Sequence, residues 1–242
     1  MLSHESLPAP LSCFSRLRDV PWCLHPSSHG EQEINMGNVF VNVGMSLDGF
    51  LAGPNGGPKN PLGDGGVAIH QWAFQTRAFM EHLGMEGGDS LSRDNEIAQH
   101  TFERTGAYIL GRRMFDEGEY NWPENAPFHA PVIVLTNSPR IPWERKGGTT
   151  FYFASDTVEA ALEKARKAAG NKDVRISGGA SVIQQYFNAG LVDELDIQLA
   201  PMFLGKGTRL FDHMETLKAK LEIVEVINSP IITHLKYKIA PV

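Results

Sequence analysis

The segment Ile176-Ser177-Gly178-Gly179-Ala180-Ser181 joins a short apolar run to a stretch whose apolar residues have helical spacing. Small residues at a strand-to-helix turn let the backbone approach a phosphate closely, while the first turn of the helix points free N–H groups at it. The segment is therefore a candidate anion site. Two glycines that merely form a tight connection explain it about equally well, and the spacing is not the G-x-G-x-x-G fingerprint of a dinucleotide-binding domain.

The sequence around this segment alternates between β-prone runs and amphipathic runs. Turn residues at 46–49, 136–139 and 228–230 separate several of them, and Gly106, Gly170 and Gly190 are expected to end helices. Strands are predicted near 39–45, 107–110, 131–135, 150–153, 174–176, 194–199, 221–227 and 231–239, and helices near 71–80, 92–105, 156–169 and 182–189. We expect an α/β fold with a mixed sheet, helices on both faces and an antiparallel C-terminal hairpin.

Polar groups follow two further predicted strands. Gly111-Arg112-Arg113 comes directly after the strand at 107–110, and a guanidinium there can pair with a phosphate through two hydrogen bonds. Thr136-Asn137-Ser138 follows the strand at 131–135 and offers hydroxyl and amide groups. Each segment alone is also typical of a solvated turn. Open α/β sheets bind ligands at the carboxyl ends of their strands, so the three segments together favour a phosphate-containing ligand.

The 242 residues have the composition of an ordinary globular protein, with 42% apolar and 21% charged residues. The formal net charge of −6 argues against nonspecific nucleic-acid binding, and no apolar stretch is long enough to span a bilayer. The two cysteines, Cys13 and Cys23, lie near the N-terminus, so no disulfide framework is expected in the rest of the chain. A cytoplasmic location fits this cysteine usage.

Residues 1–35 are rich in Pro, Ser and His and show no clear period, whereas a strong strand pattern begins after Met36. We predict a disordered N-terminal extension over 1–35 and one folded domain over 36–242. Met36 as the natural start and a genuine flexible tail are equally good interpretations.

Several catalytic motifs are excluded. Leu204-Gly205-Lys206-Gly207-Thr208 resembles a phosphate-binding P-loop but lacks its four-residue spacer and first glycine. There is no G-x-S-x-G nucleophile elbow. The histidines are scattered without the spacing of a metal site, so no metal is predicted.

From about Met36 to Ala240 the chain resembles the dihydrofolate-reductase-like proteins that include the C-terminal reductase domain of the riboflavin-biosynthesis deaminase-reductase. The matching segments, in the same order, are Met45-Ser46-Leu47-Asp48-Gly49, Gly111-Arg112-Arg113-Met114-Phe115, Ile176-Ser177-Gly178-Gly179-Ala180, Gly190-Leu191-Val192-Asp193-Glu194-Leu195 and Pro201-Met202-Phe203-Leu204-Gly205-Lys206-Gly207. The resemblance implies a mainly parallel mixed sheet, NADPH as hydride donor and a homodimer. In such an enzyme the cofactor carries the chemistry, so no protein nucleophile is needed.

The resemblance also assigns roles to residues. It implies that the 178–181 turn meets the pyrophosphate, that Arg112, Arg113 and the 136–138 turn surround the adenosine end with its 2′-phosphate, and that Met45 borders the nicotinamide. The implied cofactor-binding set is Met45, Gly111, Arg112, Arg113, Leu135, Thr136, Asn137, Ser138, Ile176, Gly178, Gly179, Ala180, Ser181 and Val182. Asp48 and Glu194 would be catalytic groups facing a substrate beside Trp72. The alternatives are a turn-capping carboxylate for Asp48 and a solvated acid at a strand start for Glu194.

The chain also departs from the family pattern. Met114 stands where many relatives carry Thr, which removes a hydroxyl beside the cofactor. The zinc motif of the deaminase half cannot be written from two N-terminal cysteines. The loops at 53–66 and 84–91 have no match in the riboflavin enzyme, so its 5-amino-6-(5-phosphoribosylamino)uracil reductase activity cannot be assumed. We expect an NADPH-dependent reductase of a small heterocyclic (pteridine- or pyrimidine-like) or conjugated substrate; a true dihydrofolate reductase and a noncatalytic NADPH-binding or regulatory protein are the alternatives.

Overall fold

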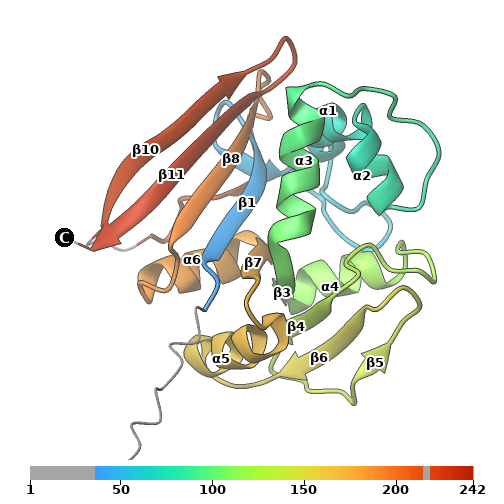
Figure 1. Ribbon diagram of the computed structural model, residues 1–242, viewed down its shortest axis with the longest axis vertical. Helices are drawn as coiled ribbons and strands as arrows, with labels where there is room; N and C mark the ends of the chain where they lie inside the picture. Colours follow the sequence, from blue (N-terminus) through green and yellow to red (C-terminus); the bar gives the residue numbers. More distant parts are fainter. Residues whose placement is uncertain (1–35, 215–218, 242) are drawn as a thin grey trace, which may run out of the picture. The chain divides into compact units, whose positions relative to one another are not determined.

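The computed structural model describes residues 36–214 and 219–241. The main sheet is formed by β1 (Val39–Ser46), β3 (Thr105–Gly111), β4 (Pro131–Leu135), β5 (Trp143–Glu144), β6 (Thr150–Ala154), β7 (Asp173–Gly178), β8 (Glu194–Ala200), β10 (Ala219–Asn228) and β11 (Thr233–Pro241). Their order across the sheet is β10-β11-β8-β1-β7-β3-β4-β6-β5 (Figure 1). The predictions for residues 1–35, including a start at Met36, lie outside the described residues.

Strands β8, β1, β7, β3, β4 and β6 are parallel to one another, whereas β11 pairs antiparallel with β8, β10 antiparallel with β11, and β5 antiparallel with β6. Two short strands, β2 (Phe50–Ala52) and β9 (Thr208–Arg209), form a separate small sheet. The predicted α/β class, the mixed and mainly parallel sheet and the C-terminal hairpin are all confirmed.

The described helices are η1 (Gly66–His70), α1 (Gln71–Phe74), α2 (Arg77–His82), α3 (Arg93–Arg104), α4 (Arg112–Glu119), α5 (Val158–Ala169) and α6 (Ala180–Asn188). The apolar sides of α5 and α6 pack on one face of the sheet, in the largest hydrophobic cluster. On the other face Phe115 of α4 packs against Tyr108, and the Arg104 guanidinium of α3 lies 4.2 Å from the centre of the Phe40 ring. Helices therefore cover both faces, as predicted. No helix in the described part of the chain is long and apolar enough to cross a membrane.

The strand order positions the ligand-binding edge. The chain passes from β3 through α4 to the neighbouring β4, but from β6 it returns through α5 and places β7 between β1 and β3. The carboxyl ends of β1, β7, β3, β4 and β6 consequently lie side by side. A crevice at this edge is where sheets of this kind bind ligands.

Candidate functional site

A cleft of about 1060 Å³ opens at the carboxyl ends of the parallel strands. Its walls are the ends of β1, β3, β4, β6 and β7 on one side and η1, α1, α2 and α3 on the other. Most of the predicted cofactor residues line it: Gly111, Arg112, Arg113, Leu135, Thr136, Asn137, Gly178, Gly179, Ala180, Ser181 and Val182. Trp72, predicted to border the substrate, lines the same cleft.

The turn between β7 and α6 presents bare backbone to the cleft. Gly178 has φ +125°, a conformation that favours glycine, and its peptide bond to Gly179 is cis. A Cβ on Gly179 would meet no atom within 4 Å, so the backbone there borders open space. Helix α6 begins at Ala180, and the first N–H groups of a helix have no partner within it. The turn and the helix N-terminus together form a site suited to an anion.

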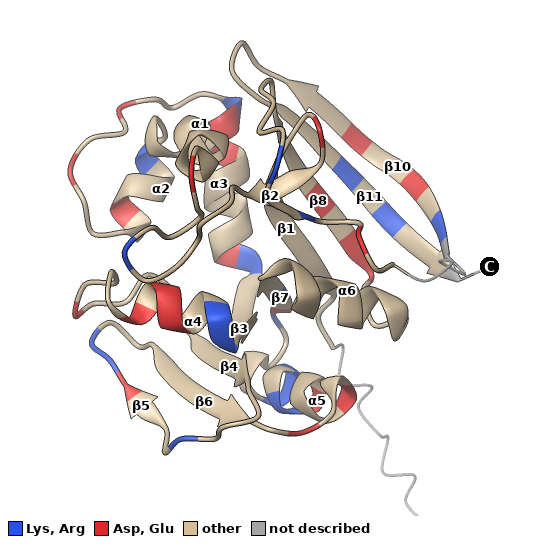
Figure 2. Ribbon diagram, turned by 180° about the vertical axis from the view of Figure 1, so that it is seen from behind, with Lys and Arg blue, Asp and Glu red and all other residues tan. Residues whose placement is uncertain are grey.

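Two arginines begin α4 at the end of β3, and Figure 2 shows them as the basic start of a helix that continues with acidic residues. Arg112 donates from Nε to Asp116 Oδ1 at 2.7 Å and from Nη1 to the Ser138 carbonyl at 3.3 Å. Arg113 donates from Nε to Glu117 at 2.9 Å. Each guanidinium has five donors, so both keep donors available to a phosphate.

The turn after β4 is held by its own side chain. The Ser138 N–H donates to Thr136 Oγ1 at 3.0 Å, and the Thr136 N–H donates to the Ala154 carbonyl at 2.9 Å. Thr136 and Asn137 line the cleft, whereas Ser138 does not. Ser138 contributes its carbonyl to the placement of Arg112 instead.

The end of β6 was missed by sequence analysis. Residues 154–158 line the cleft beside the 136–138 turn. The capping pattern there predicts a helix start, and the Thr157 hydroxyl does accept the Ala160 N–H at 3.3 Å. The position of β6 next to β4 could not be read from the sequence, although a polar strand end was the available signal.

Two predicted cofactor residues point away from the cleft. Met45 and Ile176 are buried in the cluster beneath α5 and α6, and neither lines the cleft. Successive side chains of a strand point to opposite faces, so Ser177, next to Ile176, lines the cleft in its place.

Asp48, predicted to be catalytic, holds a turn and does not line the cleft. It accepts hydrogen bonds from the Ser46 hydroxyl at 2.6 Å and from the Leu204 and Gly205 N–H groups at 3.1 and 2.7 Å. The Ser46 hydroxyl, followed by these backbone donors, outweighs partial desolvation and lowers the pKa of Asp48 to about 2. The structure supports the turn-capping alternative for this carboxylate.

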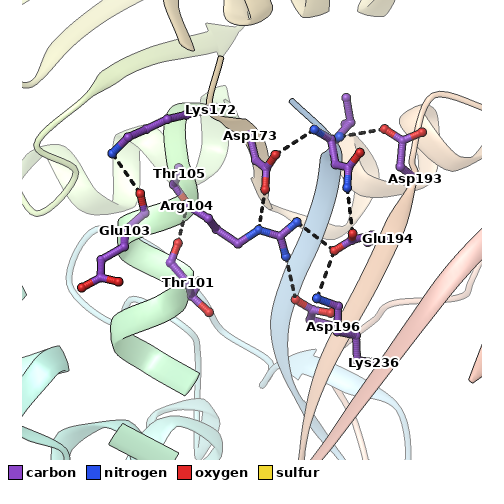
Figure 3. Close-up of polar contacts among 12 residues, drawn as sticks. Thr101, Glu103, Arg104, Thr105, Lys172, Asp173, Asp193, Glu194, Asp196 and Lys236 are labelled. Atoms are coloured by element: carbon purple, nitrogen blue, oxygen red, sulfur yellow. Dashed lines mark hydrogen bonds and ion pairs between the residues drawn. The ribbon is translucent and has the colours of Figure 1, made fainter. Parts of the chain in front are cut away.

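Glu194, the second predicted catalytic acid, lies at the amino end of β8, the opposite edge of the sheet from the cleft. Figure 3 shows it accepting from Arg104 Nη2 at 2.8 Å, with Lys236 Nζ 3.3 Å away. Burial would raise the pKa of Glu194, but Arg104 and Lys236 outweigh it and lower that pKa below its ordinary value. Glu194 does not line the cleft, because a residue at the start of β8 lies at the amino ends of the parallel strands, away from their carboxyl ends.

Two neutral histidines, His70 and His82, line the cleft near Arg175, in the part that we call the inner part of the cleft. Burial, together with the charge of Arg175, lowers the pKa of His70 to about 4. Burial and the nearby His129 lower the pKa of His82 to about 4 as well, and its ring stacks on Phe102 at 3.7 Å. Both histidines line the cleft and are uncharged near neutral pH. Neither was predicted, since a lone histidine carries no pattern.

The family model of the RibD C-terminal domain matches residues 38–232 of this chain. The chain belongs to the RibD C-terminal domain family. YyaP, an uncharacterised protein of Bacillus subtilis strain 168, is 33% identical over 195 residues, which cover 80% of this chain and 91% of YyaP. The family predicted from the sequence motifs is therefore confirmed.

Solved structures share the fold of this RibD C-terminal domain. A protein of Shewanella sp. PV-4 assigned to riboflavin biosynthesis aligns with a TM-score of 0.59 at 18% identity, covering 84% of this chain and 99% of its own. A pyrimidine reductase-like protein of Corynebacterium diphtheriae aligns with a TM-score of 0.51 at 13% identity, covering 86% and 93%. At these identities the likeness concerns the fold.

Proposed function

We propose that this RibD C-terminal domain protein is an NADPH-dependent reductase of a small heterocyclic or conjugated substrate. The observation that carries the proposal is the β7–α6 turn, which presents glycine backbone and a helix N-terminus to a cleft at the carboxyl ends of the strands. Membership of the family and the fold shared with a pyrimidine reductase-like protein support the same conclusion.

The residues present fit the cofactor. The Gly178–Ser181 turn would hold the pyrophosphate, because its residues line the cleft at a helix N-terminus and the space in front of Gly179 is open. Arg112 and Arg113 would hold the adenosine 2′-phosphate, with Thr136 and Asn137 beside the adenosine. NADPH, when bound, supplies the hydride that reduces the substrate.

The inner part of the cleft remains for the substrate. Ligand pockets usually measure about 300–1000 Å³, and this cleft, at about 1060 Å³, lies at the upper end of that range, which leaves room for a substrate beside the cofactor. Trp72 and the neutral His70 border this inner part, where Gly44 of β1 approaches the His70 ring so closely that a Cβ would lie 2.9 Å from its Cε1. A flat, conjugated molecule fits such walls.

The cofactor assignment is tested with Gly179→Asp. The added side chain has open space, so the fold is expected to tolerate it, but its carboxylate would face the pyrophosphate. Like charges brought together cost several kcal/mol, so we expect the Kd for NADPH to rise at least about tenfold. NADPH fluorescence titration measures this.

The matched control is Ala168→Asp, which adds the same charge to an exposed position of α5. It should bind NADPH like the parent protein. Equal NADPH affinity in Gly179→Asp and in the parent would reject the assignment. NADPH oxidation assayed with pteridines, aminopyrimidines, flavins, enones and dihydrofolate then separates a reductase from a noncatalytic NADPH-binding protein.

A further inference from the structure

Arg175 carries a buried positive charge into the inner part of the cleft. It lies on β7 three residues before Gly178, on the face of the sheet opposite to α5 and α6, and it lines the cleft. Its Nη2 donates to the Asn42 carbonyl at 3.1 Å, while its Nε is buried and has no hydrogen-bond partner. Burial lowers the pKa of this guanidinium below its ordinary value.

No carboxylate within the described residues forms an ion pair with Arg175. Asp196 attracts Arg175 electrostatically, but this carboxylate also lies 3.9 Å from Arg104, so its charge acts on both arginines. Arg175 interacts with the Asn42 carbonyl and with Tyr108, but a buried guanidinium that has no carboxylate paired directly with it is unfavourable in a folded protein. An ionisable group that burial perturbs inside a cleft is a candidate for ligand binding.

The groups around Arg175 suit an oxygen-rich ligand. Asn42 of β1 and Gln198 of β8 are buried polar side chains that line the same cleft from neighbouring strands. Ser177 lines it too, and its hydroxyl is buried without a partner. On the other side, the Tyr108 ring centre lies 6.0 Å from the guanidinium carbon. His70 is uncharged, so Arg175 is not competing with a second cation there.

We propose that Arg175 is the anion-binding residue of the substrate pocket, and that the substrate is a flat conjugated molecule bearing a carboxylate or another anionic oxygen seated on this guanidinium. The proposal rests on the proposed function, because it places the substrate beyond the pyrophosphate turn. The fork of an arginine recognises two oxygens of a planar anion, which a lysine cannot do.

The test uses the full-length protein saturated with NADP⁺, so that the phosphate-binding turn is filled. Benzoate and formate serve as planar anions, inorganic phosphate as a tetrahedral one and benzamide as a neutral match to benzoate. Binding is measured from the concentration dependence of the thermal unfolding midpoint, since a ligand that binds the folded state raises it. We expect benzoate to stabilise the protein and benzamide to have at least a tenfold weaker effect. A response to phosphate alone would overturn the planar anion in favour of a phosphate group.

Arg175→Met removes the charge while keeping an unbranched side chain. We expect at least a tenfold loss of benzoate affinity, with the NADPH Kd unchanged and the ligand-free unfolding midpoint equal to or above that of the parent protein. Lys167→Met, on the exposed surface of α5, should respond to benzoate as the parent does. Equal benzoate affinity in Arg175→Met and the parent, or a lowered ligand-free midpoint without a loss of anion binding, would assign the arginine to the fold. Failure to bind NADPH at all would instead count against the proposed function.

Discussion

Alternate residues of β7 serve different parts of the molecule. Ile176 is fully buried beneath the helices, whereas Arg175 and Ser177, on either side of it, line the cleft. The continuous motif at the end of β7 therefore contains both core residues and cleft residues, because side chains alternate along a strand. The glycines that follow matter through their backbone, so they could be identified from the sequence more securely than the side chains before them.

Replacing Glu194 tests whether an acidic residue at the start of a strand stabilises the fold. Glu194→Gln removes the charge that Arg104 and Lys236 approach, and the cost should be about 1–3 kcal/mol of unfolding free energy at neutral pH. NADPH affinity should not change. Urea denaturation gives the first quantity and fluorescence titration the second.

The effect of Glu194 should also depend on pH. Its pKa is lower in the folded than in the unfolded state, so the stabilisation is fully present above the unfolded pKa of about 4.5 and is lost as the pH falls through the folded value. The stability difference between Glu194→Gln and the parent should therefore shrink below about pH 4.5. Exposed Glu163→Gln should show no such difference, and equal stabilities at neutral pH would mean that the ion pairs contribute nothing.

At the scale of elements, a buried histidine–aspartate pair links helix α3 to strand β11. His234 Nε2 lies 2.8 Å from Asp94 Oδ1, and both side chains are almost fully buried. Asp94→Ala would leave His234 with neither ring nitrogen bonded, since its Nδ1 has no partner among the described residues. We expect a loss of about 1–3 kcal/mol in unfolding free energy.

The control for Asp94→Ala lies on the same helix. Glu96 forms an exposed ion pair with Arg93, and Glu96→Ala should cost less than about 0.5 kcal/mol. Chemical denaturation of the two variants compares them directly. Similar losses of unfolding free energy in both variants would show that the buried pair stabilises the fold no more than the exposed ion pair does.

Helix boundaries show where the sequence stops being sufficient. The apolar pattern through 71–80 predicts one helix, but two short helices form, α1 and α2. At the break the Thr76 hydroxyl donates to the Ala73 carbonyl at 2.7 Å, an alternative to the helical ladder. The Ala78 N–H then donates to Asn95 Oδ1, a cap supplied from α3. Local periodicity predicts that a helix exists, whereas a cap from a distant element cannot be seen in it.

At the scale of the whole described fold, the site depends on strand order. The sequence shows the strand ends at 111, 136 and 178 but not that β7 inserts between β1 and β3. That insertion brings the Gly178–Gly179 turn close to Gly111, where a Cβ would lie 2.8 Å from Val182 Cγ2 and 3.8 Å from the Gly179 nitrogen. The family resemblance grouped the cofactor residues together without giving this strand order. The residues of the inner part of the cleft could be identified only from the three-dimensional arrangement.

The edge strand β10 bears on the predicted homodimer. It pairs with β11 alone within the described residues, and its apolar side chains are exposed, with Ile223 71% accessible beside Val224 and Val226. Figure 2 shows acidic residues of β10 beside basic residues of β11. Their charges offset one another, so they do little to repel another chain from the free edge of β10. A long apolar edge of this kind favours pairing with another chain.

We therefore expect a dimer of this chain to bury β10, and Ile223→Lys to shift it toward the monomer by placing a charge in the interface. Sedimentation velocity over a range of concentrations measures the shift. Tyr120→Lys, which changes an equally exposed aromatic residue after α4, should leave the dimer intact. A parent protein that sediments as a monomer at all concentrations would contradict the prediction. A dimer unaffected by Ile223→Lys would move the interface away from β10.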